Sequence, residues 1–311
     1  MESHPRLRVA VLVNEAAGTV LRLGAANLEA QLRSAFEQSG IAASLMVLAS
    51  ADLAAAAKAA LEQARAGQFD AIMAGGGDGS IRTIAGILAG TEIPLGILPL
   101  GTLNHFARDL GIPPDPRAAV AAMATGTVRR VDVGVMNGAI FLNNSSIGLY
   151  PFLVLRRERQ RRRRHLPKWL AMVLALLRVP RHLPLFPLTV RVEGLAESCR
   201  TPLVFIGNND YQLALPALGR RERLDGAELS IFVARSDSFR AFLWLALRII
   251  LGFSQAAHEM RIVKGKSADI VSGRRRLLAA FDGEVELVHP PLHYQIRPGA
   301  LRVFVPSETN A

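Results

Sequence analysis

The first hundred residues alternate short apolar runs with longer amphipathic segments. The apolar runs predict four strands, at residues 8–13, 43–48, 69–74 and 95–98. Between them, the spacing of apolar residues predicts helices over residues 21–39 and 52–66, the second with Asp52 as its N-cap. A third helix is expected over residues 81–89. Strands that alternate with helices pair in parallel through right-handed crossovers, so this region predicts a doubly wound α/β parallel sheet.

From about residue 131 the pattern changes to short strand-like runs separated by turn residues. Asn137-Gly138, Asp225-Gly226 and Asp282-Gly283 are dipeptides typical of tight turns. The runs lie at residues 133–136, 140–143, 203–207, 229–234, 277–281, 285–288 and 301–305. Many short strands with turns between them predict a mostly antiparallel β-sandwich.

These two patterns divide the chain into two predicted domains. The first covers residues 1–130 and is expected to bind nucleotide, while the second covers residues 131–311 and is expected to bind the substrate. Helical patterns at residues 156–179 and 239–252 are insertions in the second domain. The last predicted strand is a candidate to return to the first domain.

A glycine-rich loop follows the third predicted strand. Its sequence is Gly75-Gly76-Gly77-Asp78-Gly79-Ser80, and a predicted helix comes directly after it. Glycines let backbone N–H groups approach an anion without interference from a Cβ, and a helix N-terminus adds partial positive charge. Asp78 repels phosphate unless a cation bridges the two groups, which favours a nucleotide phosphoryl site with Mg²⁺. The alternative is a tight strand-to-helix turn with a surface aspartate.

A second loop of this kind follows the fourth predicted strand. Residues 99–108 read Pro-Leu-Gly-Thr-Leu-Asn-His-Phe-Ala-Arg, with Thr102 and Asn104 near the start of an expected helix. Both side chains can donate to phosphate or ribose, although Thr and Asn are also common helix caps. Parallel sheets bind ligands at the carboxyl ends of their strands, and both loops are expected there.

Together the two loops resemble the diacylglycerol kinase catalytic-domain family, the group that holds bacterial lipid kinases and sphingosine kinases. One family mark, Gly-Gly-Asp-Gly-Thr, stands at residues 76–80 with serine in place of threonine. The other, Pro-x-Gly-Thr-x-Asn-x-Phe-Ala-Arg, stands at residues 99–108 without departure. Residues 14–18 resemble an Asn-Pro-x-x-Gly segment that has lost its proline, and residues 141–148 resemble the segment that opens the second domain.

Two later motifs extend the resemblance over nearly the whole chain. Leu224-Asp225-Gly226 is similar to an Asp-Asp-Gly metal loop that has lost its first aspartate. Asp282-Gly283-Glu284 matches a late Asp-Gly-Glu motif in place and type. Taken alone, either Asp-Gly pair is an ordinary turn.

The resemblance implies an enzyme that transfers the γ-phosphoryl group of ATP to a lipid hydroxyl, such as that of diacylglycerol. It assigns proton acceptance to Glu284, with Asp282 in support, and places Asp78 beside the metal-bridged phosphates. Mg²⁺ is expected at Asp225 and at the carbonyl groups of Glu222 and Ala227. The residues expected to bind nucleotide are Gly76, Gly77, Asp78, Gly79, Ser80, Ile81, Arg82, Thr102 and Asn104.

The distribution of charge along the chain predicts binding to a membrane surface. The chain has 311 residues, half of them apolar, and a formal net charge of +11. Between residues 156 and 181 there are nine arginines and one lysine against one acidic residue, and this tract overlaps an apolar stretch at residues 169–177. The combination predicts docking on anionic lipid, with residues 239–253 as a second candidate for lipid contact or, alternatively, as core. The basic run at residues 156–164 has no interleaved Phe, Trp or Tyr as a platform for base stacking, so nucleic acid is not an expected partner.

The remaining features concern location and alternatives. A single cysteine, Cys199, fits a reducing compartment, and no apolar run reaches the ~20 residues needed to span a bilayer. We therefore expect a cytoplasmic protein associated peripherally with the inner face of the membrane.

Two other functions stay open: a small-molecule kinase of the NAD kinase or phosphofructokinase type, and a catalytically silent lipid-binding module. The sequence indicates neither the acceptor lipid species nor an oligomeric state.

Overall fold

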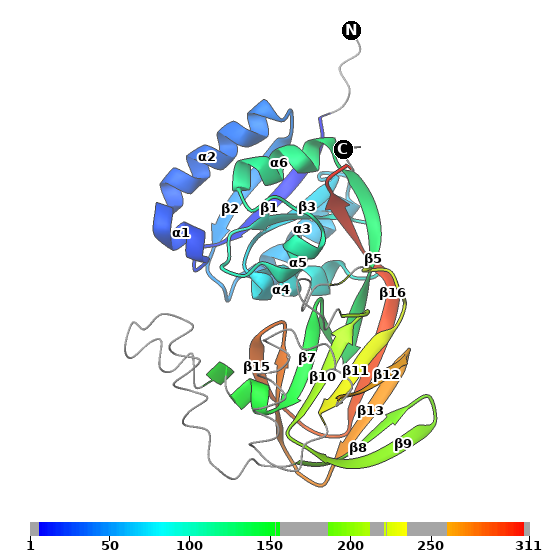
Figure 1. Ribbon diagram of the computed structural model, residues 1–311. Coiled ribbons are helices and arrows are strands. Elements are labelled where there is room, and N and C mark those ends of the chain that lie inside the picture. Colours follow the sequence, from blue (N-terminus) through cyan, green and yellow to red (C-terminus); the bar gives the residue numbers. More distant parts are fainter. Residues whose placement is uncertain are drawn as a thin grey trace. The chain divides into compact units, whose positions relative to one another are not determined.

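The chain folds into two compact units. The computed structural model describes residues 6–152, 154–155, 186–211, 221, 223–234 and 260–307 (Figure 1). The first unit runs to Val133 and takes up the chain again from Pro298, and the second unit is Gly134–Arg297. The predicted helical insertions, the basic tract and Glu222 lie outside the described residues.

The first unit is a parallel sheet with helices on both of its faces. Its strands pair in the order β2-β1-β3-β4, and the end of β16 pairs in parallel with β4. They are β1 (Arg8–Asn14), β2 (Ala42–Leu48), β3 (Ala71–Gly76), β4 (Leu95–Pro99) and the last part of β16 (Leu292–Val305). The helices are α1 (Gly18–Leu23), α2 (Ala25–Gln38), α3 (Leu53–Arg65), α4 (Asp78–Leu88), α5 (His105–Asp109) and α6 (Pro116–Thr125).

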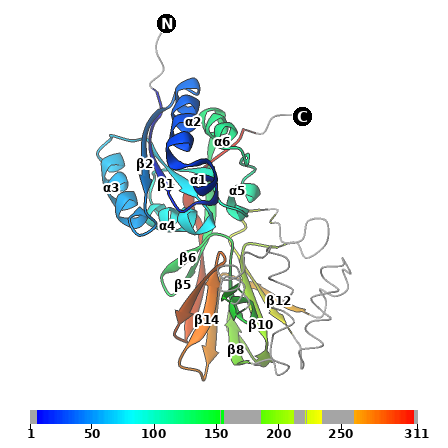
Figure 2. The same ribbon diagram turned by 90° about the vertical axis from the view of Figure 1, so that its left-hand side faces the viewer.

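The predicted doubly wound sheet is confirmed. Figure 2 shows α3 on one face of the sheet and α2 and α6 on the other. All residues of β3 are buried, as are all residues of β1 after Arg8, because helices cover these strands on both sides. The four apolar runs that predicted strands are thus the centre of this unit.

Two details of the predicted helices were wrong. The helix expected over residues 21–39 is divided into α1 and α2 by Gly24, whose φ of 82° lies in the left-handed region and interrupts helical geometry. Asp52 does occupy the N-cap position of α3, but its side chain makes no capping hydrogen bond. Its backbone is already helical there, with φ −91° and ψ −14°, whereas a capping side chain is usually supported by an extended backbone.

The second unit contains two antiparallel sheets, which confirms the predicted sandwich. One pairs the start of β16 with β13, β8 and β9, and with β5 and β6; the other has the order β12-β11-β10-β7-β14-β15. The strands are β5 (Thr127–Met136), β6 (Ala139–Phe141), β7 (Asn144–Gly148), β8 (Phe186–Val192), β9 (Leu195–Thr201), β10 (Leu203–Asn208), β11 (Leu229–Ala234), β12 (Met260–Gly265), β13 (Ser267–Ser272), β14 (Leu277–Phe281) and β15 (Glu284–Val288). Apolar side chains from both sheets form one core, among them Phe141, Ile147, Ile206, Ile270 and Tyr294.

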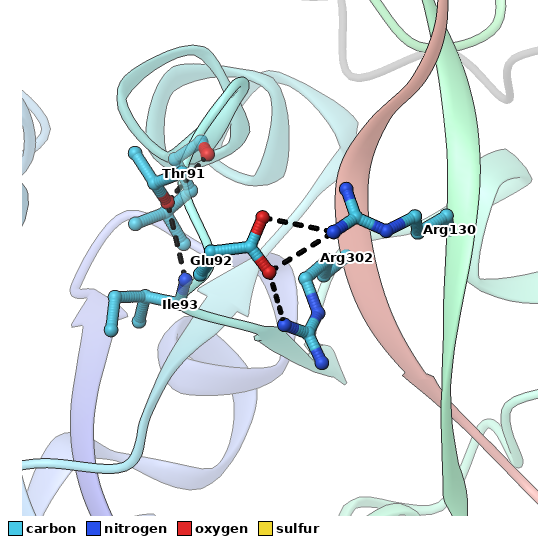
Figure 3. Close-up of polar contacts among 6 residues, drawn as sticks. Thr91, Glu92, Ile93, Arg130 and Arg302 are labelled. Carbon is cyan, nitrogen blue, oxygen red and sulfur yellow. Dashed lines mark hydrogen bonds and ion pairs between the residues drawn. The ribbon is translucent and has the colours of Figure 1, made fainter.

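An ion-pair cluster ties three chain segments of the first unit together (Figure 3). Glu92, between α4 and β4, accepts hydrogen bonds from Arg130 of β5 at 2.9 and 3.0 Å and from Arg302 of β16 at 2.6 Å. The hydrogen bonds from Arg130 and then Arg302 hold the pKa of the Glu92 carboxyl below its usual value. The cluster thereby fastens the C-terminal strand to the segment that precedes β4.

Replacing Glu92 with glutamine is expected to lower the Tm of the protein modestly at neutral pH. A carboxyl with a lowered folded-state pKa stabilises the fold above its unfolded pKa and loses this effect as pH falls through the folded value. The Tm difference between Glu92→Gln and wild type should therefore shrink as the pH falls below the ordinary carboxyl range and the Glu92 carboxylate becomes protonated. Thermal unfolding followed by circular dichroism at neutral and acid pH measures this, and an unchanged difference in acid would contradict the ion-pair origin.

Candidate active site

Three loops of the first unit meet at the carboxyl ends of its parallel strands. The Leu100 N–H donates to the Gly76 carbonyl at 3.0 Å, and the Thr19 N–H donates to the Leu100 carbonyl at 3.0 Å. Gly101 packs directly on Gly77, because a Cβ built on Gly101 would lie only 2.5 Å from the Gly77 Cα. The β1–α1, β3–α4 and β4–α5 loops are therefore joined backbone to backbone, as the two-loop prediction requires.

The glycine loop leads directly into the first turn of α4. Gly77 is the N-cap residue and offers no side chain to the helix, so the N–H groups of Asp78, Gly79 and Ser80 have no intrahelical acceptor. A Cβ on Gly76 would lie 2.5 Å from the Ser80 Cβ, which explains why the loop needs glycine at this close approach. The result is a cradle of backbone donors at the positive end of an eleven-residue helix.

The predicted phosphate contacts divide into backbone and side-chain donors. Ser80 and Ile81 have buried side chains, and the Ile81 N–H already donates to the Gly77 carbonyl. Ser80 can therefore contribute its backbone N–H, whereas Ile81 packs into the core. Arg82 is half-buried and Thr102 is exposed, so the side chains of both residues, unlike that of Ser80, are accessible to a ligand.

Asp78 links the two glycine loops. Its carboxylate oxygen Oδ1 accepts the backbone N–H of Phe106, in the first turn of α5, at 3.2 Å. The side chain is half-buried at the start of α4, where a negative charge interacts favourably with the helix dipole. The carboxylate is thus held at the convergence of the loops, where a bridging cation would be needed beside phosphate.

Asn104 closes its own loop. Its Oδ1 accepts the Gly101 N–H at 3.0 Å, and its Nδ2 donates to the carbonyls of Pro99 at 3.2 Å and Gly101 at 3.1 Å. Both amide hydrogens are consumed in this way, so the side chain has no donor left for phosphate or ribose. Its backbone is left-handed, with φ 48°, a conformation that Asn tolerates better than most residues. The geometry favours a positioning role over the contact expected from the sequence.

Asn14 is a further member of the site whose contacts the sequence did not reveal. It is buried at the end of β1, and its Nδ2 donates to the Ser80 Oγ at 2.8 Å. Its Oδ1 accepts the Ala16 N–H at 2.9 Å and the Ser50 hydroxyl at 3.0 Å. One amide thus connects the loops that follow β1 and β2 to the start of α4. The sequence feature that could have indicated this role is a polar residue at the end of an otherwise apolar central strand.

The Asp-Gly-Glu motif forms the tight turn between β14 and β15 in the second unit. Asp282 and Gly283 both have positive φ, 49° and 88°, as a two-residue hairpin turn requires. The Asp282 carboxylate accepts three backbone N–H groups, from Leu142 at 2.8 Å, Asn143 at 2.7 Å and Asn144 at 3.2 Å. This carboxylate therefore fixes the turn, while Glu284 follows it as the exposed first residue of β15.

The predicted metal loop presents oxygen atoms in the second unit. The Asp225 carboxylate accepts from the Arg223 Nε at 3.1 Å, and Ala227 has a left-handed φ of 56°. The Asn209 Oδ1 is buried without a hydrogen-bond partner, and a Cβ on Gly226 would lie 2.8 Å from it. Within the described ranges there is no cluster of three or more His, Cys, Asp or Glu side chains. The carboxylate of Asp225 and the unpaired amide oxygen nonetheless suit a hard cation such as Mg²⁺.

A Gly101→Ala variant is expected to disrupt the contact between the two loops. The new methyl group would lie 2.5 Å from the Gly77 Cα and 2.6 Å from the Asn104 Oδ1, so the backbone must move. We expect a loss of about 1–3 kcal/mol in the free energy of unfolding and weaker nucleotide binding. Chemical denaturation and calorimetric titration with ATP measure the two effects.

Gly273→Ala is the matched control, because a Cβ at Gly273 meets nothing within 4 Å. It should leave stability and nucleotide binding close to wild type. Equal behaviour of the two variants would show that the contact between Gly77 and Gly101 is unimportant.

The fold places two converging glycine loops, rich in backbone N–H donors, at the carboxyl ends of a doubly wound sheet. Residues 8–136 match the family model described as the diacylglycerol kinase catalytic domain. Through this region the chain is similar to the diacylglycerol kinase catalytic domain.

The chain is also similar to individual proteins with kinase names. A diacylglycerol kinase of Mycobacterium tuberculosis is 29% identical over 242 residues, which cover 76% of this chain and 77% of that protein. A Pseudomonas aeruginosa protein named "Probable lipid kinase YegS-like" is 48% identical over 90 residues, 28% of this chain. That match spans only 30% of the length of the Pseudomonas protein.

Solved structures share the whole fold. A chain from Bacillus anthracis superposes with a TM-score of 0.73 at 24% identity, covering 99% of this chain and 100% of that one. A second, named a diacylglycerol kinase, gives a TM-score of 0.64 at 22% identity. Because the sequence identities are below 25%, these superpositions are evidence for a shared fold and not for a shared function.

Proposed function

We propose that this protein transfers the γ-phosphoryl group of ATP to a hydroxyl group of a lipid, such as diacylglycerol. The observation that carries the proposal is the junction of the two glycine loops at the ends of β3 and β4, with Asp78 held between them. The names of the relatives, diacylglycerol kinase and lipid kinase, support a lipid as the acceptor.

ATP would bind with its phosphates at the first turn of α4. The backbone N–H groups of Asp78, Gly79 and Ser80 are oriented donors, and Thr102 offers a hydroxyl from the second loop. Phosphoryl transfer depends mainly on positioning and on neutralising negative charge, and such fixed donors serve both purposes. Mg²⁺, when bound, would neutralise charge on the phosphates; Asp225, Ala227 and Glu222 are the residues proposed to hold a Mg²⁺ ion.

The acceptor hydroxyl would lose its proton to Glu284. This carboxylate is exposed at the start of β15, and the turn before it is fixed by the three hydrogen bonds to Asp282. A base placed in this way contributes about 10²–10⁴-fold to the rate. In this scheme Asp282 holds the geometry and Glu284 touches the substrate.

A lipid acceptor requires contact with a membrane, and the proposed contact is peripheral. Among the described residues no helix is long and apolar enough to cross a bilayer. The arginine-rich residues 156–164 supply positive charge suited to anionic headgroups on the inner face of the membrane.

The direct test is incubation with labelled ATP, Mg²⁺ and mixed micelles that contain diacylglycerol, a sphingoid base or phosphatidylglycerol. Chromatography should show label in one lipid product, and the Glu284→Gln variant should form far less of it. Label in a soluble metabolite instead would indicate a small-molecule kinase. Tight retention on liposomes without any labelled product would indicate a silent lipid-binding module.

A further inference from the structure

Arg221 is a buried cation in the second unit, just before the predicted metal loop. Only 6% of its surface is exposed. One guanidinium nitrogen, Nη1, donates to the carbonyls of Leu142 at 2.6 Å and Asn208 at 3.3 Å, and Nη2 donates to the Asn143 Oδ1 at 2.7 Å. The guanidinium also lies over the ring of Tyr211, 5.7 Å from its centroid. Arg221 is therefore firmly attached to residues 142–143.

The same short segment is held by Asp282 through its N–H groups. The Leu142 carbonyl and the Asn143 Oδ1 accept hydrogen bonds from Arg221. The backbone N–H groups of the same two residues donate to the Asp282 carboxylate. Oxygen atoms thus face the positive charge and N–H groups face the negative charge. Both interactions are charge-assisted, and such hydrogen bonds are roughly twice as strong as neutral ones.

Asn208 completes the attachment on the Arg221 side. Its Nδ2 donates to the Leu142 carbonyl at 2.8 Å, and its backbone N–H donates to the Asn143 carbonyl at 2.9 Å. The backbone N–H of Asp282 in turn donates to the Asn144 carbonyl at 3.0 Å. Residues 142–144 therefore connect Arg221 with the turn before Glu284.

We propose that Arg221 is a positioning residue for Glu284. By fixing residues 142–144 it fixes the Asp282 carboxylate, and Asp282 in turn maintains the left-handed turn that presents Glu284. Asp-Gly favours this turn by itself, and the three hydrogen bonds to the Asp282 carboxylate fix where the turn, with Asp282 at φ 49°, is held relative to residues 142–144. The role assigned to Glu284 rests on the proposed function, whereas the hold of Arg221 on the turn does not.

Arg221→Lys tests the proposal with the smallest change. Lysine keeps the positive charge but replaces the planar fork by a single ammonium, which cannot reproduce the paired contacts to Leu142 and Asn143. Arg191→Lys is the matched control, because Arg191 is exposed on β8 of the same unit. Thermal unfolding of both variants establishes that each is folded before other measurements are made.

The first readout is hydrogen exchange followed by mass spectrometry. Arg221→Lys should accelerate exchange at residues 142–144 and 281–284 and leave the β3–α4 region unchanged, and Arg191→Lys should do neither. Unchanged exchange at residues 281–284 in folded Arg221→Lys would overturn the proposal. This readout needs no substrate, so it remains decisive even if the wild-type protein phosphorylates no lipid.

The second readout is steady-state kinetics with whichever lipid the labelled-ATP assay shows to be phosphorylated. A small displacement of a catalytic group can cost about 10²-fold in rate, so kcat of Arg221→Lys should fall by up to ~10²-fold while KM for ATP stays constant. A purely structural arginine would lower the amount of folded enzyme, and hence the apparent activity, without changing kcat per folded molecule. A kcat equal to that of Arg191→Lys would overturn the positioning role.

Discussion

Asp78→Ala is expected to abolish ATP-dependent lipid phosphorylation while the protein stays folded. The substitution removes the one carboxylate held at the junction of the two glycine loops, where it would face the cation-bridged phosphates. Removal of a preorganised electrostatic group of this kind costs about 10²–10³-fold in kcat, and the loss of the acceptor for the Phe106 N–H misplaces α5 as well. Labelled-ATP assays on the purified variant measure the effect.

Asp78→Asn separates the two contributions. It keeps an oxygen acceptor for the Phe106 N–H but has no charge, so it loses only the favourable interaction with the α4 dipole. Its Tm should therefore fall less than that of Asp78→Ala, while its activity stays very low. Asp78→Ala should lose about 1 kcal/mol of unfolding free energy through the missing hydrogen bond. Turnover like that of wild type in either variant would remove Asp78 from the phosphate site.

Glu284→Gln is expected to lower kcat by about 10²–10⁴-fold, because the amide cannot accept the proton of the acceptor hydroxyl. KM for ATP should change little, since the nucleotide is proposed to bind in the first unit. Glu284 is exposed, so the substitution should leave the free energy of unfolding within about 0.5 kcal/mol of wild type. Initial rates at saturating ATP, with lipid varied in mixed micelles, provide the measurement.

Glu286→Gln is the control for this experiment. Glu286 lies two residues further along β15, on the same side of the strand, and is also exposed. It therefore has the same side chain as Glu284 in a similar environment. Its kcat should stay near the wild-type value. Equal losses in the two variants would show that the charge of this strand matters and that Glu284 is no specific base.

Local patterns predicted the parts of the fold that depend on local chemistry. The four strands of the first unit were apparent because central strands of a covered parallel sheet are continuous apolar runs. By contrast, β7 (Asn144–Gly148) begins with polar residues that are partly or fully buried, and its sequence carries no strand signal. Its place comes from pairing with β10 and β14 on either side.

The glycine loops illustrate the same division at the site. Their sequences indicated phosphate binding because glycines before a helix let backbone N–H groups approach an anion at the positive end of the helix dipole. Asn104 was expected to contact the nucleotide, and the structure instead shows its amide closing the loop around Gly101. The Asn104 amide can donate two hydrogen bonds and accept others, and the sequence does not indicate which groups will be its partners.

The sequence by itself predicted an α/β region followed by an antiparallel β region, the glycine-rich loops after two strands and the family resemblance, because strand periodicity, glycine runs and short motifs are properties of neighbouring residues. Only the tertiary structure decided that Asn14 joins three loops and that Arg221 and Asp282 hold residues 142–144 from both sides. Arg221 and Asp282 each lie more than seventy positions from the segment they hold. Hydrogen bonds between residues so far apart depend on how the strands pair and pack, and no local pattern encodes that geometry.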